Sequence, residues 1–302
     1  MEKMSFASEV KKELAARVYE KACCKRSFLY GLLIFSKYFS QASVGCQTEN
    51  RTVAELYRSL LADVANVRCS LSASASGKIY SVSVSSPADC QKVRALFSHD
   101  RGEISLKINH ANFDCPDCLG AFLAGAFLAC GTVSSPRKDY HLEFTVPHLN
   151  LAKDFFLFLT ELELSPKETK RRGYPVIYFK ESEAIEDCLY RMGAGNAMFE
   201  MMNVEIEKNV RNGVNRKTNC DTANIGRTAK AAARQINAIT LIRDRRGLDC
   251  LGPELKELAL LRLENPDLSL SELAEVCTPK LSRSGINHRL QKILSIAQEL
   301  QK

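Results

Sequence analysis

The last predicted helix of the chain carries polar side chains that suit contact with nucleic acid. Its apolar residues recur at helical spacing and centre on one face: Ile286, Leu290, Ile293, Leu294, Ala297 and Leu300. The other side presents hydroxyl, amide, imidazole and cationic groups near the helix N-terminus, and such groups bond to base edges and phosphates in the major groove. We predict DNA contacts from Ser282, Arg283, Ser284, Asn287, His288, Arg289, Gln291 and Lys292. The alternative is an ordinary solvated face, although Glu299 is the only acid from Leu281 onward.

Basic residues are concentrated in the last third of the chain. Residues 208–302 contain 17 Lys and Arg against 10 Asp and Glu, whereas residues 1–207 contain 25 of each. The stretch 208–246 alone has 10 basic and 2 acidic residues, a net charge of +8. A block of this kind suits a polyanion, and a solvated linker is the alternative. We predict contacts to the DNA backbone from Arg211, Arg216, Lys217, Arg227, Lys230 and Arg234.

Cysteine is the other residue type with possible chemistry. The chain has 12 cysteines, and its charged N-terminus lacks an apolar signal-peptide core, so we expect reduced thiols inside the cell. Cys115 and Cys118 have the spacing of zinc ligands, and Cys23 and Cys24 could supply two more sulfurs. Because vicinal cysteines are poor chelators and no second CxxC pair exists, we predict no metal site and no cofactor.

The last helix is the third of three predicted helices, and the first two position its polar side chains. Pro253 begins the first of them. The spacing of Ser269 and Glu272 matches a capping box, which predicts that the second helix starts there. Thr278–Pro279–Lys280 form a turn, and the last helix begins near residue 282 or 284. This order of elements predicts a helix-turn-helix.

Two further segments lead into this motif. Residues 206–226 have no sustained apolar period and are rich in Asn and basic residues, so we interpret them as a basic linker. A basic helix is predicted from Arg227 to Arg245, and Gly247 ends it. We therefore assign residues 227–302 to an all-α helix-turn-helix domain.

Residues 1–205 contain a diverged repeat, with halves at about 1–110 and 111–205. The second half predicts helices at 119–131, 149–162 and 182–192 and strands at 140–146, 167–170 and 176–180. The first half repeats the order, with helices at 24–39, 52–64 and 87–97 and strands at 42–48, 67–75 and 78–85. Gly31 and Gly125 lie inside the first helix of each half, where a glycine costs about 1 kcal/mol relative to alanine. Such a cost is usually offset by close approach, so these two helices are expected to pack together and join the halves.

Several segments resemble the WhiA family of bacterial proteins. They are MSFASEVKKELA, Cys23-Cys24-Lys-Arg, FLAGAFLACGTVSSPRKDYHLEF, NVRNGVNRKTNCDTANIGRTAKAAARQINAI and LSLSELAEV…LSRSGINHRLQKI. The resemblance implies an α+β fold: an N-terminal LAGLIDADG homing-endonuclease-like domain, a duplicated αββαββα unit, followed by the helix-turn-helix. Members of the family act as transcriptional regulators linked to sporulation or cell division, and some are associated with chromosome segregation.

The implied fold raises the question of DNA cleavage. In homing endonucleases the eighth position of each LAGLIDADG helix is an acid that holds the catalytic divalent metals. Here the corresponding positions are Ser36 and Cys130, and no acid lies within residues 27–47 or 119–137. Neither side chain replaces a carboxylate as a hard ligand for Mg²⁺. We predict that the protein is not an enzyme and has no catalytic residues.

Three functions remain open on sequence alone: a sequence-selective regulator, a largely non-specific chromosome-associated protein, and an endonuclease, which the missing acids disfavour. We expect double-stranded DNA as the partner, with a protein partner possible through the N-terminal domain. No apolar run approaches the roughly 18 residues of a membrane span, so we expect a cytoplasmic, nucleoid-associated protein. The sequence does not give the oligomeric state.

Overall fold

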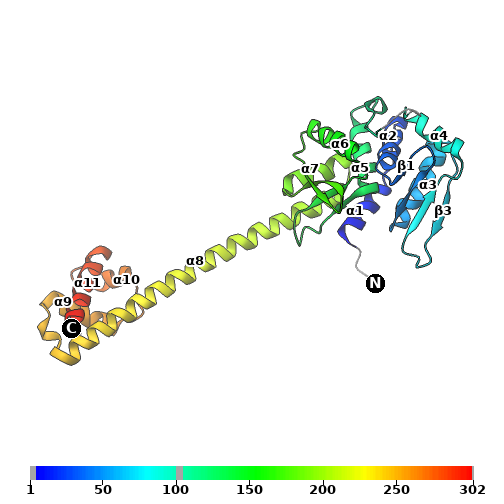
Figure 1. The fold of residues 1–302 in the computed structure, drawn as a ribbon. Coiled ribbons are helices and arrows are strands. Elements are labelled where there is room, and N and C mark those ends of the chain that lie inside the picture. The colour runs from blue at the N-terminus through cyan, green and yellow to red at the C-terminus, as the bar shows by residue number, and fades with distance from the viewer. Residues whose placement is uncertain (1–4, 100–104, 301–302) are drawn as a thin grey trace. The chain divides into compact units, whose positions relative to one another are not determined.

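The computed structural model describes residues 5–99 and 105–300. The chain divides into two compact units, unit 1 (Met1–Lys208) and unit 2 (Asn209–Lys302). Unit 1 combines helices and strands, whereas the described elements of unit 2 are helical (Figure 1). The predicted α+β fold with an all-α C-terminal part is confirmed. Among the described residues, no helix has both the length and the apolar character needed to cross a membrane.

Unit 1 is built from two copies of one arrangement. The first copy comprises α2 (Ala22–Ile34), β1 (Tyr38–Phe39), β2 (Val44–Thr48), α3 (Arg51–Ala65), β3 (Ser70–Ala73), β4 (Tyr80–Ser83) and α4 (Pro87–Leu96). The second comprises α5 (Asp117–Cys130), β5 (Gly131–Val133), β6 (Leu142–Thr145), α6 (Leu149–Glu161), β7 (Lys167–Arg171), β8 (Tyr174–Phe179) and α7 (Ser182–Met192). Outside the copies lie α1 (Phe6–Ala15) and the short η1 (His110–Asn112).

The sheets of the two copies have the same topology. Their strand orders are β1-β2-β4-β3 and β5-β6-β8-β7, and every pairing is antiparallel. The predicted duplication is therefore confirmed in topology as well as in element order. One predicted helix, 24–39, was too long, since α2 ends at Ile34 and Phe39 pairs with Val44 in the sheet.

The central helices α2 and α5 pack against each other through their glycines. A Cβ atom at Gly31 would lie 2.1 Å from the Phe122 carbonyl oxygen, and one at Gly125 would lie 2.1 Å from the Phe28 carbonyl oxygen. Only glycine lets the two backbones come so close. The predicted close approach is confirmed, and a single buried core extends across both copies.

The long helix α8 (Gly195–Arg246) corrects one prediction. Residues 206–226, interpreted above as a basic linker before the helix, are helical throughout, and the helix does not begin at Arg227. Side chains from 209 to 231 are exposed, so this stretch faces no core and needs no apolar period. Its sequence also contains no proline, so the helix continues through it. Gly247, with a φ of 73°, ends the helix as predicted.

Unit 2 packs three short helices against the end of α8. They are α9 (Pro253–Glu264), α10 (Leu270–Val276) and α11 (Arg283–Glu299), with η2 (Leu248–Cys250) before them. Ile242 of α8 is buried with Leu258, Leu273 and Leu290, one from each of the three helices. The predicted helix starts at Pro253 and Ser269 are confirmed, and Ser282 is the N-cap of the last helix.

Candidate nucleic-acid interface

Local hydrogen bonds fix the starts of α10 and α11, the two helices on either side of the turn. The Ser269 hydroxyl accepts from the Glu272 amide at 3.3 Å, and the Glu272 carboxylate accepts from the Ser269 amide at 2.7 Å. This is the predicted capping box. At the start of α11 the Ser282 hydroxyl accepts from the Gly285 amide at 3.1 Å. The start of α11 is therefore fixed by its own sequence.

A buried arginine holds the loop between α9 and α10. Arg262 is 1% exposed, and its guanidinium donates to the carbonyl oxygens of Leu268 at 2.6 Å and Asn265 at 3.3 Å. Burial lowers the pKa of Arg262 below its usual value, but an arginine stays charged at any physiological pH. The contact stabilises the carbonyl end of α9 and sets the path into α10.

The N-terminal half of α11 exposes most of the residues predicted to contact DNA. Residues four apart form two neighbouring rows along the helix, one through 283, 287 and 291 and the other through 284, 288 and 292. The positive end of the helix dipole lies at the same end and favours an anion there. The exposed members are Ser282, Arg283, Ser284, Asn287, His288, Gln291 and Lys292.

Arg289 differs from its neighbours. Its side chain is only 24% exposed, and its guanidinium lies 2.9 Å from the Glu254 carboxylate of α9. The pair joins α11 to α9, so the structure gives Arg289 an intramolecular partner that sequence spacing did not indicate.

The six basic residues predicted on α8 are all exposed, but they do not form one surface. At 3.6 residues per turn, Arg216, Arg227, Lys230 and Arg234 fall on one side of the helix, whereas Arg211 and Lys217 fall on others. Lys230 and Arg234 line a pocket with Leu294 and Gln298. That pocket lies beside the C-terminal half of α11, whereas the exposed rows lie along its N-terminal half. The predicted residues thus form two separate sets, the exposed rows of α11 and the four basic residues on one side of α8.

The second candidate site lies at the C-terminal ends of α2 and α5, where a LAGLIDADG nuclease would hold its acids. Ser36 is 3% exposed there and donates its hydroxyl proton to the Leu32 carbonyl oxygen at 2.6 Å. Burial raises the pKa of Cys130 to about 12, so this thiol is neutral at physiological pH. Neither group offers a negatively charged oxygen to a metal ion.

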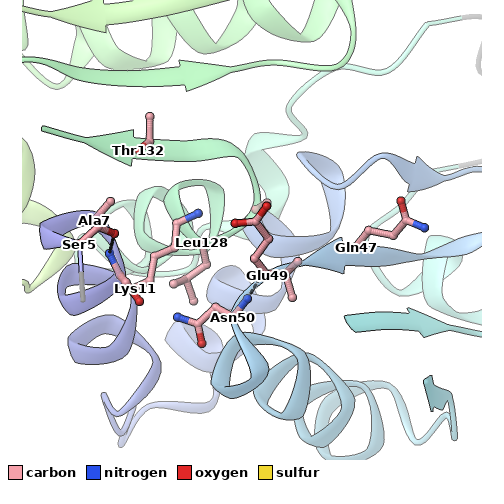
Figure 2. A pocket seen from close by; sticks show the side chains of 11 residues that line it. Ser5, Ala7, Lys11, Gln47, Glu49, Asn50, Leu128 and Thr132 are labelled. Atoms are coloured by element: carbon pink, nitrogen blue, oxygen red, sulfur yellow. Dashed lines mark hydrogen bonds between the residues drawn. The ribbon is translucent and has the colours of Figure 1, made fainter. Parts of the chain in front are cut away.

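A pocket opens beside these helix ends, with Lys11 and Glu49 among its lining residues (Figure 2). Figure 2 shows Lys11 reaching into it from α1, while Glu49 follows β2. Burial lowers the pKa of Lys11 below its usual value, and the negative charge of Glu49 partly opposes that shift. A single carboxylate facing an ammonium group does not make a two-metal centre. The acids sought in the sequence were those within residues 27–47 and 119–137, so Lys11 and Glu49, which come from other elements, were missed.

Comparison with known proteins accounts for both units. Residues 119–211 match the family model for the WhiA LAGLIDADG-like domain, and residues 214–297 match that for the WhiA C-terminal HTH domain. A curated relative from Clostridium beijerinckii is 38% identical, with 98% of this chain and 99% of the relative covered. A relative from Carboxydothermus hydrogenoformans is 35% identical, with 98% of each chain covered. Both are named "Probable cell division protein WhiA".

The chain belongs to the WhiA family. Among solved structures, full-length DUF199/WhiA from Thermotoga maritima has a TM-score of 0.61 at 25% identity, covering 98% of this chain and 99% of that one. A structure of the N-terminal LAGLIDADG domain of DUF199/WhiA has a TM-score of 0.51 at 17% identity and shows the fold alone. The WhiA HTH model spans the exposed α11 residues and the four aligned basic residues of α8, whereas Arg211 ends the LAGLIDADG-like match.

Proposed function

We propose that this WhiA-family chain is a non-catalytic DNA-binding protein that regulates transcription and acts in cell division. The observation that carries the proposal is the exposed polar face of α11, capped by Ser282 and free of acidic side chains over its N-terminal half. Its residue types match those that read base edges. The name of the relatives supports the cell-division role, and a nucleoid-associated, cytoplasmic location follows from the proposal.

The two sets of residues take different tasks in this proposal. Asn287, His288 and Gln291 read base edges, because amide and imidazole groups distinguish base pairs in the major groove. Arg216, Arg227, Lys230 and Arg234 contact phosphates, which supplies affinity without sequence information. Unit 1 serves as a scaffold or as a surface for a protein partner, since residues 1–207 carry equal numbers of acids and bases. Unit 2 supplies most of the affinity for DNA.

Binding of the full chain to target and random duplexes at several salt concentrations tests this division. We expect Asn287→Ala to reduce the preference for the target by about 1 to 3 kcal/mol while weakening binding to random DNA little. Arg216→Gln should weaken both equally and lower the salt slope by about 1. Ser295→Ala, an exposed change in the C-terminal half of α11, is the matched control. If Asn287→Ala weakened binding to target and to random DNA by the same factor, base reading by Asn287 would be contradicted.

Genome-wide occupancy separates a regulator from a general chromosome-associated protein. A regulator gives a few sharp sites that share one motif, whereas non-specific binding gives broad coverage, because the two differ in specificity ratio. We expect sharp sites that Asn287→Ala abolishes. Broad coverage that survives this change would favour the chromosome-associated role.

The absence of catalysis is tested on supercoiled plasmid with Mg²⁺ or Mn²⁺. We expect no nicking by the full chain, because Glu49 is the single acid among the residues that line the pocket. Metal-dependent nicking that Glu49→Gln removes would show that the pocket is an active site.

A further inference from the structure

Four cysteines meet at the N-terminal ends of α2 and α5. Cys23 and Cys24 lie in the first turn of α2, Cys118 lies in the first turn of α5, and Cys115 lies just before it. The four Sγ atoms all lie within 4.8 Å of one another. In the part of the chain that the structure describes, this is the one such group of metal-ligating side chains. It lies at the other end of the helix pair from Ser36 and Cys130.

The sulfur–sulfur distances fit a single tetrahedral ion. Cys115 Sγ lies 3.8 Å from Cys23 Sγ, 3.5 Å from Cys24 Sγ and 3.6 Å from Cys118 Sγ, and Cys118 Sγ lies 4.0 Å from Cys24 Sγ. Four sulfurs placed about 2.3 Å from a central zinc ion would be separated by about 3.8 Å. A disulfide would instead require about 2.05 Å. The sulfurs are thus arranged as the ligands of one ion, without an open position for a substrate.

The surroundings suit a thiolate site. Both helices direct the positive ends of their dipoles toward the cysteines, which favours negatively charged sulfur. Lys21 and Arg26 flank the cysteine pair and form ion pairs with Asp117 and Asp114 at 2.7 and 3.1 Å. Cys24 and Cys118 are buried and the other two are half-buried, so the site is sheltered from solvent. Soft thiolate ligands in a tetrahedral set select zinc over magnesium or calcium.

We propose that Cys23, Cys24, Cys115 and Cys118 bind one structural zinc ion that joins the two copies of unit 1. Each copy supplies two ligands, so the ion ties the start of α2 to the start of α5, while Gly31 and Gly125 allow close packing along the helices. The expectation of no metal site rested on adjacent cysteines being poor chelators and on the lack of a second CxxC pair. In the structure all four sulfurs nevertheless lie within 4.8 Å of one another, so the adjacent pair has to supply only two of the four ligands.

The metal content of the full chain, purified without chelator and dialysed, tests the proposal. We expect one zinc ion per chain by elemental analysis and no acid-labile sulfide. Replacement of zinc by Co²⁺ should give the intense visible absorption of a tetrahedral thiolate complex. Cys115→Ser/Cys118→Ser and Cys23→Ser/Cys24→Ser should each lose the metal and this absorption.

Cys46→Ser/Cys188→Ser is the matched control, since it removes two buried thiols of unit 1 outside the cluster and should keep one zinc per chain. The wild-type measurement does not depend on whether a variant folds. A wild-type chain that retains no zinc when refolded with it, or an iron–sulfur cluster in its place, would overturn the proposal. Zinc retained by both cluster variants would overturn it as well.

Discussion

The two units of the chain differ in the size of their buried core and in their charge. Unit 1 has a core that extends across both copies, while residues 1–207 carry 25 basic and 25 acidic side chains. Unit 2 has a much smaller core, while residues 208–302 carry 17 basic and 10 acidic side chains. The large, nearly neutral unit 1 is suited to a structural role, whereas the small, basic unit 2 attracts a polyanion. The contrast supports the proposal that the smaller unit supplies most of the DNA binding.

The candidate sites of the two units differ in the same way. In unit 1 the place of the nuclease acids holds a buried serine, a neutral thiol and a pocket with one acid and one ammonium group. In unit 2 the exposed rows of α11 contain no acid over the N-terminal half of the helix. Charge and residue type therefore favour the α11 surface as the proposed DNA contact, whereas unit 1 has a LAGLIDADG-like fold without the acids.

Metal removal should give the largest difference between the units. If zinc joins the copies of unit 1, a chelator should lower the free energy of unfolding of that unit by about 4 kcal/mol, the value for a ligand present at 1,000 times its Kd. Unit 2 contains none of the four ligands and should be unaffected. Thermal unfolding followed by calorimetry and by binding of the target duplex checks this. Equal destabilisation of both units would show that they do not unfold independently.

A single methyl group at the helix crossing should have the next largest effect. Gly125→Ala places a Cβ 2.1 Å from the Phe28 carbonyl oxygen and 2.7 Å from the Leu32 amide nitrogen, and backbone atoms cannot move aside cheaply. We expect unit 1 to lose about 2 to 3 kcal/mol of stability by denaturant unfolding, as for other overpacked cores. Gly226→Ala is the control, because no atom lies within 4 Å of its Cβ. That change should stabilise α8 by up to about 1 kcal/mol. A neutral Gly125→Ala would mean that α2 and α5 lie further apart.

Sequence alone predicted much of this architecture where the signal is local. The capping box at Ser269, the proline at 253 and the N-cap at Ser282 each fix a helix end with their own side chains. The duplicated order of elements and the glycines of α2 and α5 predicted the joining of the copies. These signals depend on neighbours in the chain, so they can be recognised without a fold.

The failures share a different cause. Residues 206–226 were interpreted as a linker outside the predicted helix because apolar periodicity reports burial, and an exposed helix has none. The Arg289–Glu254 pair and the Lys11 pocket each join elements that are distant in sequence. The four cysteines were named as possible ligands from the sequence, but only the fold shows that their sulfurs lie together. The spacing of residues within one segment does not show which distant segments contact each other in the fold.

The acid sensitivity of the second sheet gives a smaller test, confined to unit 1. Burial alone would raise the pKa of Glu143, but hydrogen bonds from His141 and from Arg171, at 2.7 and 2.9 Å, hold it below its usual 4.5. A carboxylate with a lowered folded pKa stabilises the fold above about pH 4.5, and that stabilisation is lost as the pH falls through the folded value.

Glu143→Gln should therefore cost about 1 to 2 kcal/mol at neutral pH, a value reduced because the Arg171 side chain is 57% exposed. The difference from wild type should shrink in acid. Denaturant unfolding at several pH values measures both, with the exposed Glu168→Gln on β7 as control. A difference that stays constant down to strong acid would show that the carboxylate charge has no part in it.

The smallest effect concerns Arg289, a predicted contact residue on α11 that forms an ion pair with Glu254 of α9. If its main task is to hold α11 on α9, Arg289→Ala and Glu254→Ala should each cost up to about 1 kcal/mol in unit 2 and should couple in a double-mutant cycle. The salt slope of DNA binding should then stay unchanged. Lys292→Ala, in the exposed row, is the comparison, since it should lower the salt slope by about 1 and leave stability unchanged. If Arg289→Ala instead behaves like Lys292→Ala, the arginine leaves Glu254 for a phosphate, and the recognition surface of α11 is wider than its exposed rows.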